Sequence, residues 1–197
     1  MKSLIFKDWG IRAMLAGRKT MTRRLMKPQT HIGIDNIEWR TDIVIGMNEP
    51  EIPGWAMMRN GIIEGIAECP FDVGDVFCAK EIYALLCDEP YGNMKDKDKI
   101  VYRATEPHNH GCLLKWESPM FMPEKYARIF RKITNIKAER LQDISEEDAQ
   151  EEGVEFYCDL VGITHRDAFM MCMIDIYGLT VWDANPWVWV YEFEKEG

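Results

Sequence analysis

The chain has 197 residues and a formal net charge of −9, and 47% of its residues are hydrophobic and 29% charged. This composition is typical of a soluble globular protein, and the length predicts one domain with insertions or at most two small ones. No apolar run approaches the roughly 20 residues that cross a bilayer, and the N-terminus does not read as a signal peptide, so we expect a cytoplasmic protein without a membrane partner.

The cysteines and the distribution of charges narrow the class of protein further. Six cysteines are present without a C-x-x-C pair, so we expect free thiols and not a disulfide framework. Residues 1–27 carry eight basic groups against one acid, 115–140 carry seven against three, and 141–197 carry two against fourteen. The two basic segments predict a positive face suited to phosphates. The equal alternative is that they pair with the acidic C-terminal part, because sequence alone does not place charges in space.

The first predicted element is a short helix. Asp8 is the expected N-cap, and Gly17 stands where a helix C′ residue belongs. Residues 28–60 lack a periodic pattern and contain several prolines and glycines, so we interpret them as an insertion or long loop. A strand is expected at 62–68, followed by a turn at 70–75.

Strands are expected at 76–85, 100–103 and 126–141, with a second insertion at about 88–115. Ser145 and Thr164 are the predicted N-caps of two later helices, which end near Gly153 and Gly178. The strand after Pro186 places four aromatic side chains on one face by alternation, which favours the core over base stacking. These elements predict an α+β fold built as a closed or nearly closed barrel.

The run from Gly17 to Arg24 resembles the signature of ASCH domains, with Gly17, Lys19, Thr22 and Arg24 at its fixed positions. Four further segments are similar to elements of that family and occur in the same order: Val-Gly-Asp-Val at 73–76, Lys-Glu-Ile-Tyr at 80–83, a capped helix at 141–154, and Trp-Asp-Ala-Asn-Pro-Trp-Val-Trp-Val at 182–190. The last segment resembles the enlarged type of phages and prophages. Together they span the chain, as one domain with the insertions at 28–60 and 88–115.

The resemblance implies a PUA-like β-barrel with flanking helices and a cleft, and RNA or a nucleoside or nucleotide as partner. The small bacterial members that share the signature are amidohydrolases, which deacylate N4-acetylcytidine. Carried over by motif, the catalytic positions are Lys19, Thr22 and Glu152. Other members are linked to ribonuclease activity.

The chemistry of these residue types fits amide hydrolysis. A threonine hydroxyl needs a base, and a lysine whose pKa is lowered by burial or nearby positive charge can serve. Thr22 is then the nucleophile, Lys19 its activator and Glu152 the supporting carboxylate. The structural alternative is that Lys19 only offsets the dipole of the helix before Gly17, with Glu152 a solvated glutamate.

Further polar residues extend the candidate site. Arg23, Arg24 and Lys27 are predicted to hold phosphates, or else form a solvated basic turn. Glu81 lies in an apolar strand, so it either binds a base edge or pairs internally with Arg24. The cluster His108, His110 and Cys112 has ligand chemistry, but no second cluster stands at standard spacing, and neither a metal nor a cofactor is expected.

Three functions remain open from the sequence. A hydrolase of N4-acylated cytosine requires a narrow pocket. A non-catalytic RNA-binding module requires an open groove flanked by Arg23, Arg24, Lys27, Arg128, Arg131 and Lys132, with salt-sensitive affinity. A ribonuclease requires RNA cleavage that depends on the charges of the cleft.

Overall fold

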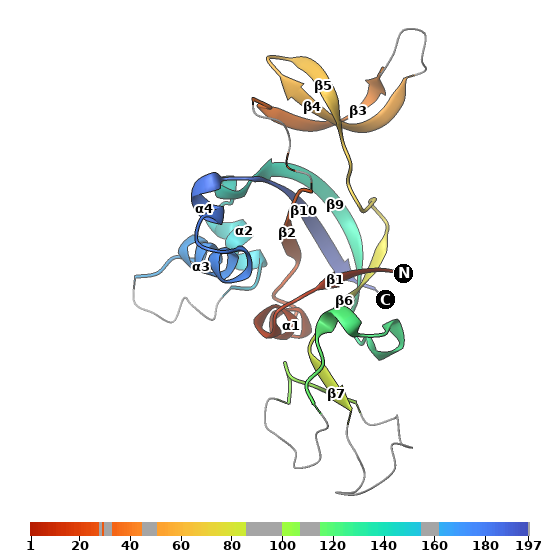
Figure 1. The fold of residues 1–197 in the computed structure, drawn as a ribbon, viewed down its shortest axis with the longest axis vertical. Coiled ribbons are helices and arrows are strands. Elements are labelled where there is room, and N and C mark those ends of the chain that lie inside the picture. Colours follow the sequence, from red (N-terminus) through yellow and green to blue (C-terminus); the bar gives the residue numbers. More distant parts are fainter. Residues whose placement is uncertain are drawn as a thin grey trace, which may run out of the picture.

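The computed structural model describes residues 1–27, 29, 33–44, 51–85, 100–106, 115–154 and 162–196. The fold is α+β, with the sheets containing most of the regular structure (Figure 1). The main sheet has the strand order β1 (Lys2–Ile5), β6 (Val76–Lys80), β9 (Phe130–Arg140), β10 (Trp187–Lys195) and β2 (Met21–Leu25). Only β1 and β6 pair in parallel, and the other three pairs are antiparallel.

The main sheet is open between β1 and β2, because no ladder joins these two edge strands within the described part of the chain. The long strands β9 and β10 curve strongly (Figure 1). The curvature brings the two edges within reach of one side chain, since Arg24 Nη2 of β2 donates a hydrogen bond to Ile5 O of β1 at 2.7 Å. The expected barrel is therefore present only as a curved, open sheet.

Both faces of β10 are buried. Trp187, Trp189, Tyr191 and Phe193 belong to the core enclosed by the curved sheet, as alternation predicted. Val188 and Val190 face the other side, where a second core is closed by α2 (Glu146–Glu151) and α3 (His165–Tyr177). Figure 1 shows these helices and α4 (Val181–Ala184) on one side of the main sheet. The aromatic face is thus core and is closed to stacking bases.

A second sheet corrects the interpretation of residues 28–60 as a loop. Strands β3 (Asn36–Ile43), β4 (Ile52–Arg59) and β5 (Ile62–Ala67) form an antiparallel sheet, which Figure 1 shows at one end of the molecule. Pro53 misled the sequence interpretation, since proline disfavours a central strand. It is tolerated because the pairing of β3 with β4 is irregular between Arg40 and Ile43, opposite Pro53.

The predicted strand 76–85 is broken in two. β6 ends at Lys80, and β7 (Tyr83–Leu85) pairs instead with β8 (Ile100–Tyr102). The break occurs at Glu81, whose carboxylate turns inward to an arginine. The long strand expected from 126 begins only at Phe130, because short 3₁₀ turns, η1 (Pro119–Phe121) and η2 (Glu124–Tyr126), precede it.

The helix caps agree with the sequence at all but one position. Ser145 caps α2 and Thr164 caps α3, each by accepting a backbone N–H three residues on. Gly17 and Gly153 adopt φ of +73° and +77° after their helices. In helix α1 (Asp8–Leu15), however, Lys7 and not Asp8 occupies the N-cap position, without a side-chain cap hydrogen bond, and the Asp8 carboxylate accepts a hydrogen bond from Arg103. Among the described helices, none has the length and apolar character needed to span a membrane.

Candidate functional site

A cavity of about 670 Å³ contains the predicted catalytic residues, and its volume lies within the ~300–1,000 Å³ usual for small-molecule sites. It lies between the segment joining β1 to α1, strand β2 and helix α3, with η1 at its side. Its apolar walls include Phe6, Trp9, Phe169, Met173 and Tyr177, and its polar groups include Lys19, Thr22, Arg24, Arg103 and Glu152. An apolar cavity with a few convergent polar groups is the usual form of a ligand site.

Lys19 and Glu152 form a buried ion pair in the wall of this cavity. Lys19 Nζ lies 2.5 Å from Glu152 Oε2 and also donates to Glu152 O at 2.8 Å. The two side chains are 1% and 3% exposed. The turn after Gly17 brings Lys19 beside the C-terminal end of α2, where Thr20 N donates to Glu151 O. The helix-dipole alternative therefore fails for Lys19, because its amine is bound to a distant helix and is not at the end of its own.

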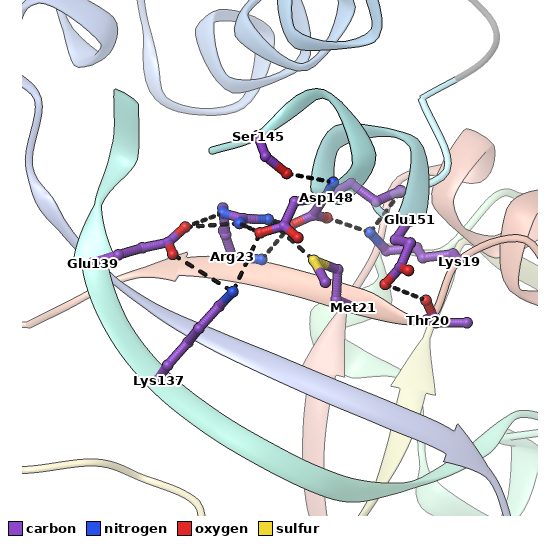
Figure 2. Close-up of polar contacts among 10 residues, drawn as sticks. Lys19, Thr20, Met21, Arg23, Lys137, Glu139, Ser145, Asp148 and Glu151 are labelled. Atoms are coloured by element: carbon purple, nitrogen blue, oxygen red, sulfur yellow. Dashed lines mark hydrogen bonds and ion pairs between the residues drawn. The ribbon is translucent and has the colours of Figure 1, made fainter. Parts of the chain in front are cut away.

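A second residue, Arg23, holds Glu152 in place. Arg23 N donates to Glu152 Oε1 at 2.6 Å, and the Arg23 guanidinium contacts the carboxylates of Glu139 and Asp148 at 2.7 and 2.5 Å. Figure 2 shows Arg23 at the centre of this network, with Lys137 joined to Glu139 and Asp148. Because the Arg23 side chain is 0% exposed, it has no free surface for the phosphate contact expected of it.

The surroundings of Lys19 disfavour its charged form. Burial lowers the pKa of Lys19 from the ordinary 10.5, Glu152 opposes that effect, and nearby Arg24 adds to it. The rings of Phe6 and Trp9 lie 5.9 and 5.4 Å from the amine. A lysine so placed is closer to the neutral amine that can accept a proton.

Thr22 lies on β2 opposite Tyr191 of β10, so its side chain is on the other side of the strand from that of Arg23. It lines the same cavity as Lys19 and Glu152 and is buried. Its hydroxyl takes part in none of the hydrogen bonds described for Lys19, Arg23 and Glu152. The structure thus brings the three predicted catalytic residues to one cavity.

Glu81 has a different partner from the one expected. Its fully buried carboxylate accepts two hydrogen bonds from Arg128, at 2.8 and 2.9 Å, and none from Arg24. Burial raises the pKa of Glu81, and Arg128 opposes the rise. β6 pairs with the start of β9, which places Arg128 beside Glu81, whereas Arg24 lies on the far edge of the sheet. Glu81 supports the neighbouring wall residue Ile82 and is not among the residues that line the cavity.

Arg24 and Lys27 remain accessible. The Arg24 guanidinium carbon lies 4.6 Å from the centre of the Phe6 ring. Lys27 is exposed at a smaller cavity, of about 380 Å³, that Arg24 also lines. Of the other predicted groove residues, Lys132 is exposed, but Arg131 is buried and donates to Phe130 O and Met14 O. The described residues therefore offer fewer free cations than the sequence suggested.

Sequence reasoning missed the wall formed by α3. Phe169, Cys172, Met173 and Ile176 recur at the spacing of one helical face, which was a usable signal. The pattern identifies an apolar face of the helix, but it does not show which part of the molecule that face lies against. In the structure, this face lines the cavity. Trp9 gave no comparable signal, because it precedes the periodic part of α1.

The last group of candidates is the set of potential metal ligands. His108, His110 and Cys112 fall outside the described residues, and within those residues no group of three or more histidine, cysteine, aspartate or glutamate side chains is placed to hold a metal ion. The cavity itself offers a hydroxyl, an amine of lowered pKa and a fixed carboxylate, which suit acyl transfer. Comparison of the chain with protein-family models, curated proteins and solved structures gives no match.

Proposed function

We propose that the chain is an ASCH-domain protein, with its curved sheet as the PUA-like barrel, that binds a modified nucleoside or nucleotide and hydrolyses the amide of an N4-acylated cytosine. The observation that carries the proposal is that the buried Lys19–Glu152 pair and Thr22 line one cavity. These residues match the catalytic positions that the resemblance implies. The apolar walls suit a flat pyrimidine ring.

The reaction we propose proceeds through an acyl-threonine. Neutral Lys19 accepts the hydroxyl proton of Thr22 while Thr22 Oγ1 bonds to the amide carbon. The carbon–nitrogen bond then breaks, and Lys19 returns the proton to the N4 amine that leaves. Water attacks the ester, again with Lys19 as base, and releases the carboxylic acid and the free hydroxyl. Glu152 orients the amine throughout, because it holds Lys19 through Oε2 while Arg23 N holds its Oε1.

The arrangement of cations favours this proposal over the open RNA-binding groove. That groove needed Arg23, Arg128 and Arg131 on a solvated surface. Arg23 and Arg131 are instead buried, with carboxylates and backbone carbonyls as partners, and the partly exposed Arg128 is paired with the buried carboxylate of Glu81. A cavity of about 670 Å³ fits one nucleoside better than it fits a folded RNA surface.

The test is release of acetate from N4-acetylcytidine by the purified protein. Thr22→Ala should lower kcat/KM at least about 100-fold, since the nucleophile and its base act together. Thr20→Ala is the matched control, because Thr20 is exposed two positions away and its hydroxyl donates to Glu151 Oε2, outside the Lys19–Glu152 pair. Turnover that survives in Thr22→Ala would contradict the mechanism, and wild-type protein that binds cytidine without any turnover would reduce the site to binding.

A further inference from the structure

The Arg23 cluster consists of Arg23, Glu139, Asp148 and Lys137 (Figure 2). Its two acids and its lysine are not among the residues that line the cavity. They are nonetheless joined to it, because Arg23 also binds Glu152, whose carboxylate holds the Lys19 amine. The cluster can therefore act on the reaction without touching the substrate.

The Glu152 carboxylate is shared between two cations. Its Oε2 lies 2.5 Å from Lys19 Nζ, and its Oε1 accepts a hydrogen bond from Arg23 N at 2.6 Å and lies 3.5 Å from Arg23 Nη1. The Arg23 guanidinium is closer to Glu139 and Asp148, at 2.7 and 2.5 Å. Because these two carboxylates compensate the charge of Arg23, the negative charge of Glu152 is left to act on Lys19.

The charges of the cluster and of the buried ion pair are balanced. Three cations and three carboxylates take part, and their charges cancel when all are ionised: Lys19, Arg23 and Lys137, with Glu139, Asp148 and Glu152. Burial raises the pKa of Asp148, but Arg23 and Lys137 outweigh that effect and hold the pKa below its ordinary 3.8, so Asp148 is ionised at neutral pH. Removal of one charge leaves an excess that water screens only weakly at a buried site.

The cluster reaches Lys19 through Glu152. Burial is the largest influence on the pKa of Lys19 and lowers it. Of the titratable groups that act on Lys19 within the described residues, Glu152 raises this pKa, Arg24 of β2 lowers it, and Cys172 of α3 raises it. Among these groups, Glu152 is bonded to Arg23. A change in the cluster is therefore felt by Lys19 as a change in the pull of Glu152.

We propose that Glu139, Asp148 and Lys137 are positioning residues of the proposed reaction, which set the pH at which Lys19 can act as its base. The proposal rests on the proposed function for the role of Lys19. Loss of a carboxylate leaves Arg23 to draw on Glu152, so the protonated amine is held less strongly and the pKa of Lys19 falls. Loss of Lys137 has the opposite sign, because carboxylate charge is then left uncompensated.

The experiment compares the pKa of Lys19 with the acid limb of the pH profile of kcat. Lys19 is observed by NMR in protein labelled with ¹³C at lysine Cε, and Lys19→Met identifies its signal. Asp148→Asn keeps the shape of the side chain without its charge. It should lower the pKa of Lys19 and move the acid limb of acetate release towards lower pH, each by about 0.5–1 pH unit.

Lys137→Met should move both quantities in the opposite direction, and by less, because the Lys137 side chain is 39% exposed. KM should stay unchanged in both variants, since neither residue lines the cavity. Glu147→Gln is the matched control. It removes an exposed carboxylate next to Asp148 on α2 and should alter neither the pKa nor the limb. If Asp148→Asn fails to fold, Glu139→Gln removes a carboxylate of the cluster from β9 and should lower the pKa of Lys19 in the same way.

An unchanged pKa of Lys19 in Asp148→Asn would overturn the proposal. A displacement of the same sign in Asp148→Asn and Lys137→Met would also overturn it, because a general disturbance of packing does not distinguish the sign of the lost charge. Neither result bears on acetate release by the wild type, so the proposed function would stand. If N4-acetylcytidine is not hydrolysed but the pKa of Lys19 moves in opposite directions in the two variants, the proposed reaction fails and the electrostatic coupling remains.

Discussion

Lys19 and Glu152 lie 133 positions apart, and their contact joins the first and last thirds of the chain. Burial of an ion pair costs desolvation that its attraction only partly offsets, so such a pair is poor evidence of stability. The carboxylate is satisfied a second time by Arg23 N, which fixes its orientation. A costly and doubly anchored pair in a cavity wall is better explained by function than by stability.

The pH dependence of stability follows from the lowered pKa of Lys19. Between that lowered value and the unfolded value near 10.5, the folded protein binds fewer protons than the unfolded chain, so its free energy of unfolding rises with pH. Relative to Lys19→Met, the free energy of unfolding of the wild type should therefore rise by up to about 1.4 kcal/mol per pH unit between these two pKa values. Urea unfolding from pH 7 to 10 measures the difference.

The control for this prediction is Lys132→Met, which removes an exposed lysine of β9. It should follow the wild-type profile. A difference between wild type and Lys19→Met that stays flat, or that falls as the pH rises, would show that burial does not dominate the titration of Lys19.

At the scale of elements, Gly153 connects α2 to the site. Its φ is +77°, and a Cβ built on it would lie 2.5 Å from Ala13 Cβ and 3.1 Å from Lys19 Cβ. The helix that carries Glu152 therefore approaches α1 and Lys19 as closely as it does only because residue 153 has no side chain. Gly17 has a similar φ of +73° but open space around it.

This pair gives a matched test of packing. Gly17→Ala should cost about 1 kcal/mol of unfolding free energy from backbone conformation alone. Gly153→Ala should cost about 1–3 kcal/mol more, because a neighbour must move, and it should also lower activity by displacing Lys19 from Glu152. Denaturant unfolding and acetate release measure the two effects, and equal costs for both variants would contradict the packing argument.

The features of the helices and strands that the sequence predicted correctly depend on residues close together in the chain. The caps Ser145 and Thr164 and the C′ glycines were predictable, because each acts on residues within one turn. The partner of Glu81 was not, because it depends on β6 meeting the start of β9, some 50 residues away. The second sheet was missed for a related reason, since Pro53 is tolerated only through an irregularity in the partner strand. The trio Lys19, Thr22 and Glu152 came from the resemblance, and the cavity that unites these residues came from the structure.

At the scale of the whole molecule, the net charge of −9 and the internal pairing of arginines limit how many phosphates the protein can hold. Affinity for single-stranded RNA falls with a slope of about −0.7 per phosphate contact in a plot of log K against log salt. A groove using all six predicted cations would give a slope near −4 on that scale. We expect a slope no steeper than about −2, because only two or three of the six cations remain accessible.

Fluorescence anisotropy of a labelled RNA oligonucleotide between about 50 and 200 mM salt measures this slope. Lys27→Ala should make the slope shallower by about 0.7, which is the contribution of one phosphate contact. A slope near −4 would restore the open-groove function and would weaken the proposal of an enclosed nucleotide site.

The central position of β10 has a consequence for synthesis. Its residues follow those of both β2 and β9 in the chain, yet β10 lies between these two strands and pairs with each. Until β10 has been translated, β2 lacks its partner strand, and Phe193 is not yet there to donate its N–H to Thr20 O. Until then the aromatic core of the nascent protein is incomplete. Long-range strand pairing of this kind is slow, and it leaves the chain prone to aggregation. β2 therefore gains its partner only once residues 187–195 have been translated, and a stop before residue 187 would leave the main sheet without the strand that joins β9 to β2.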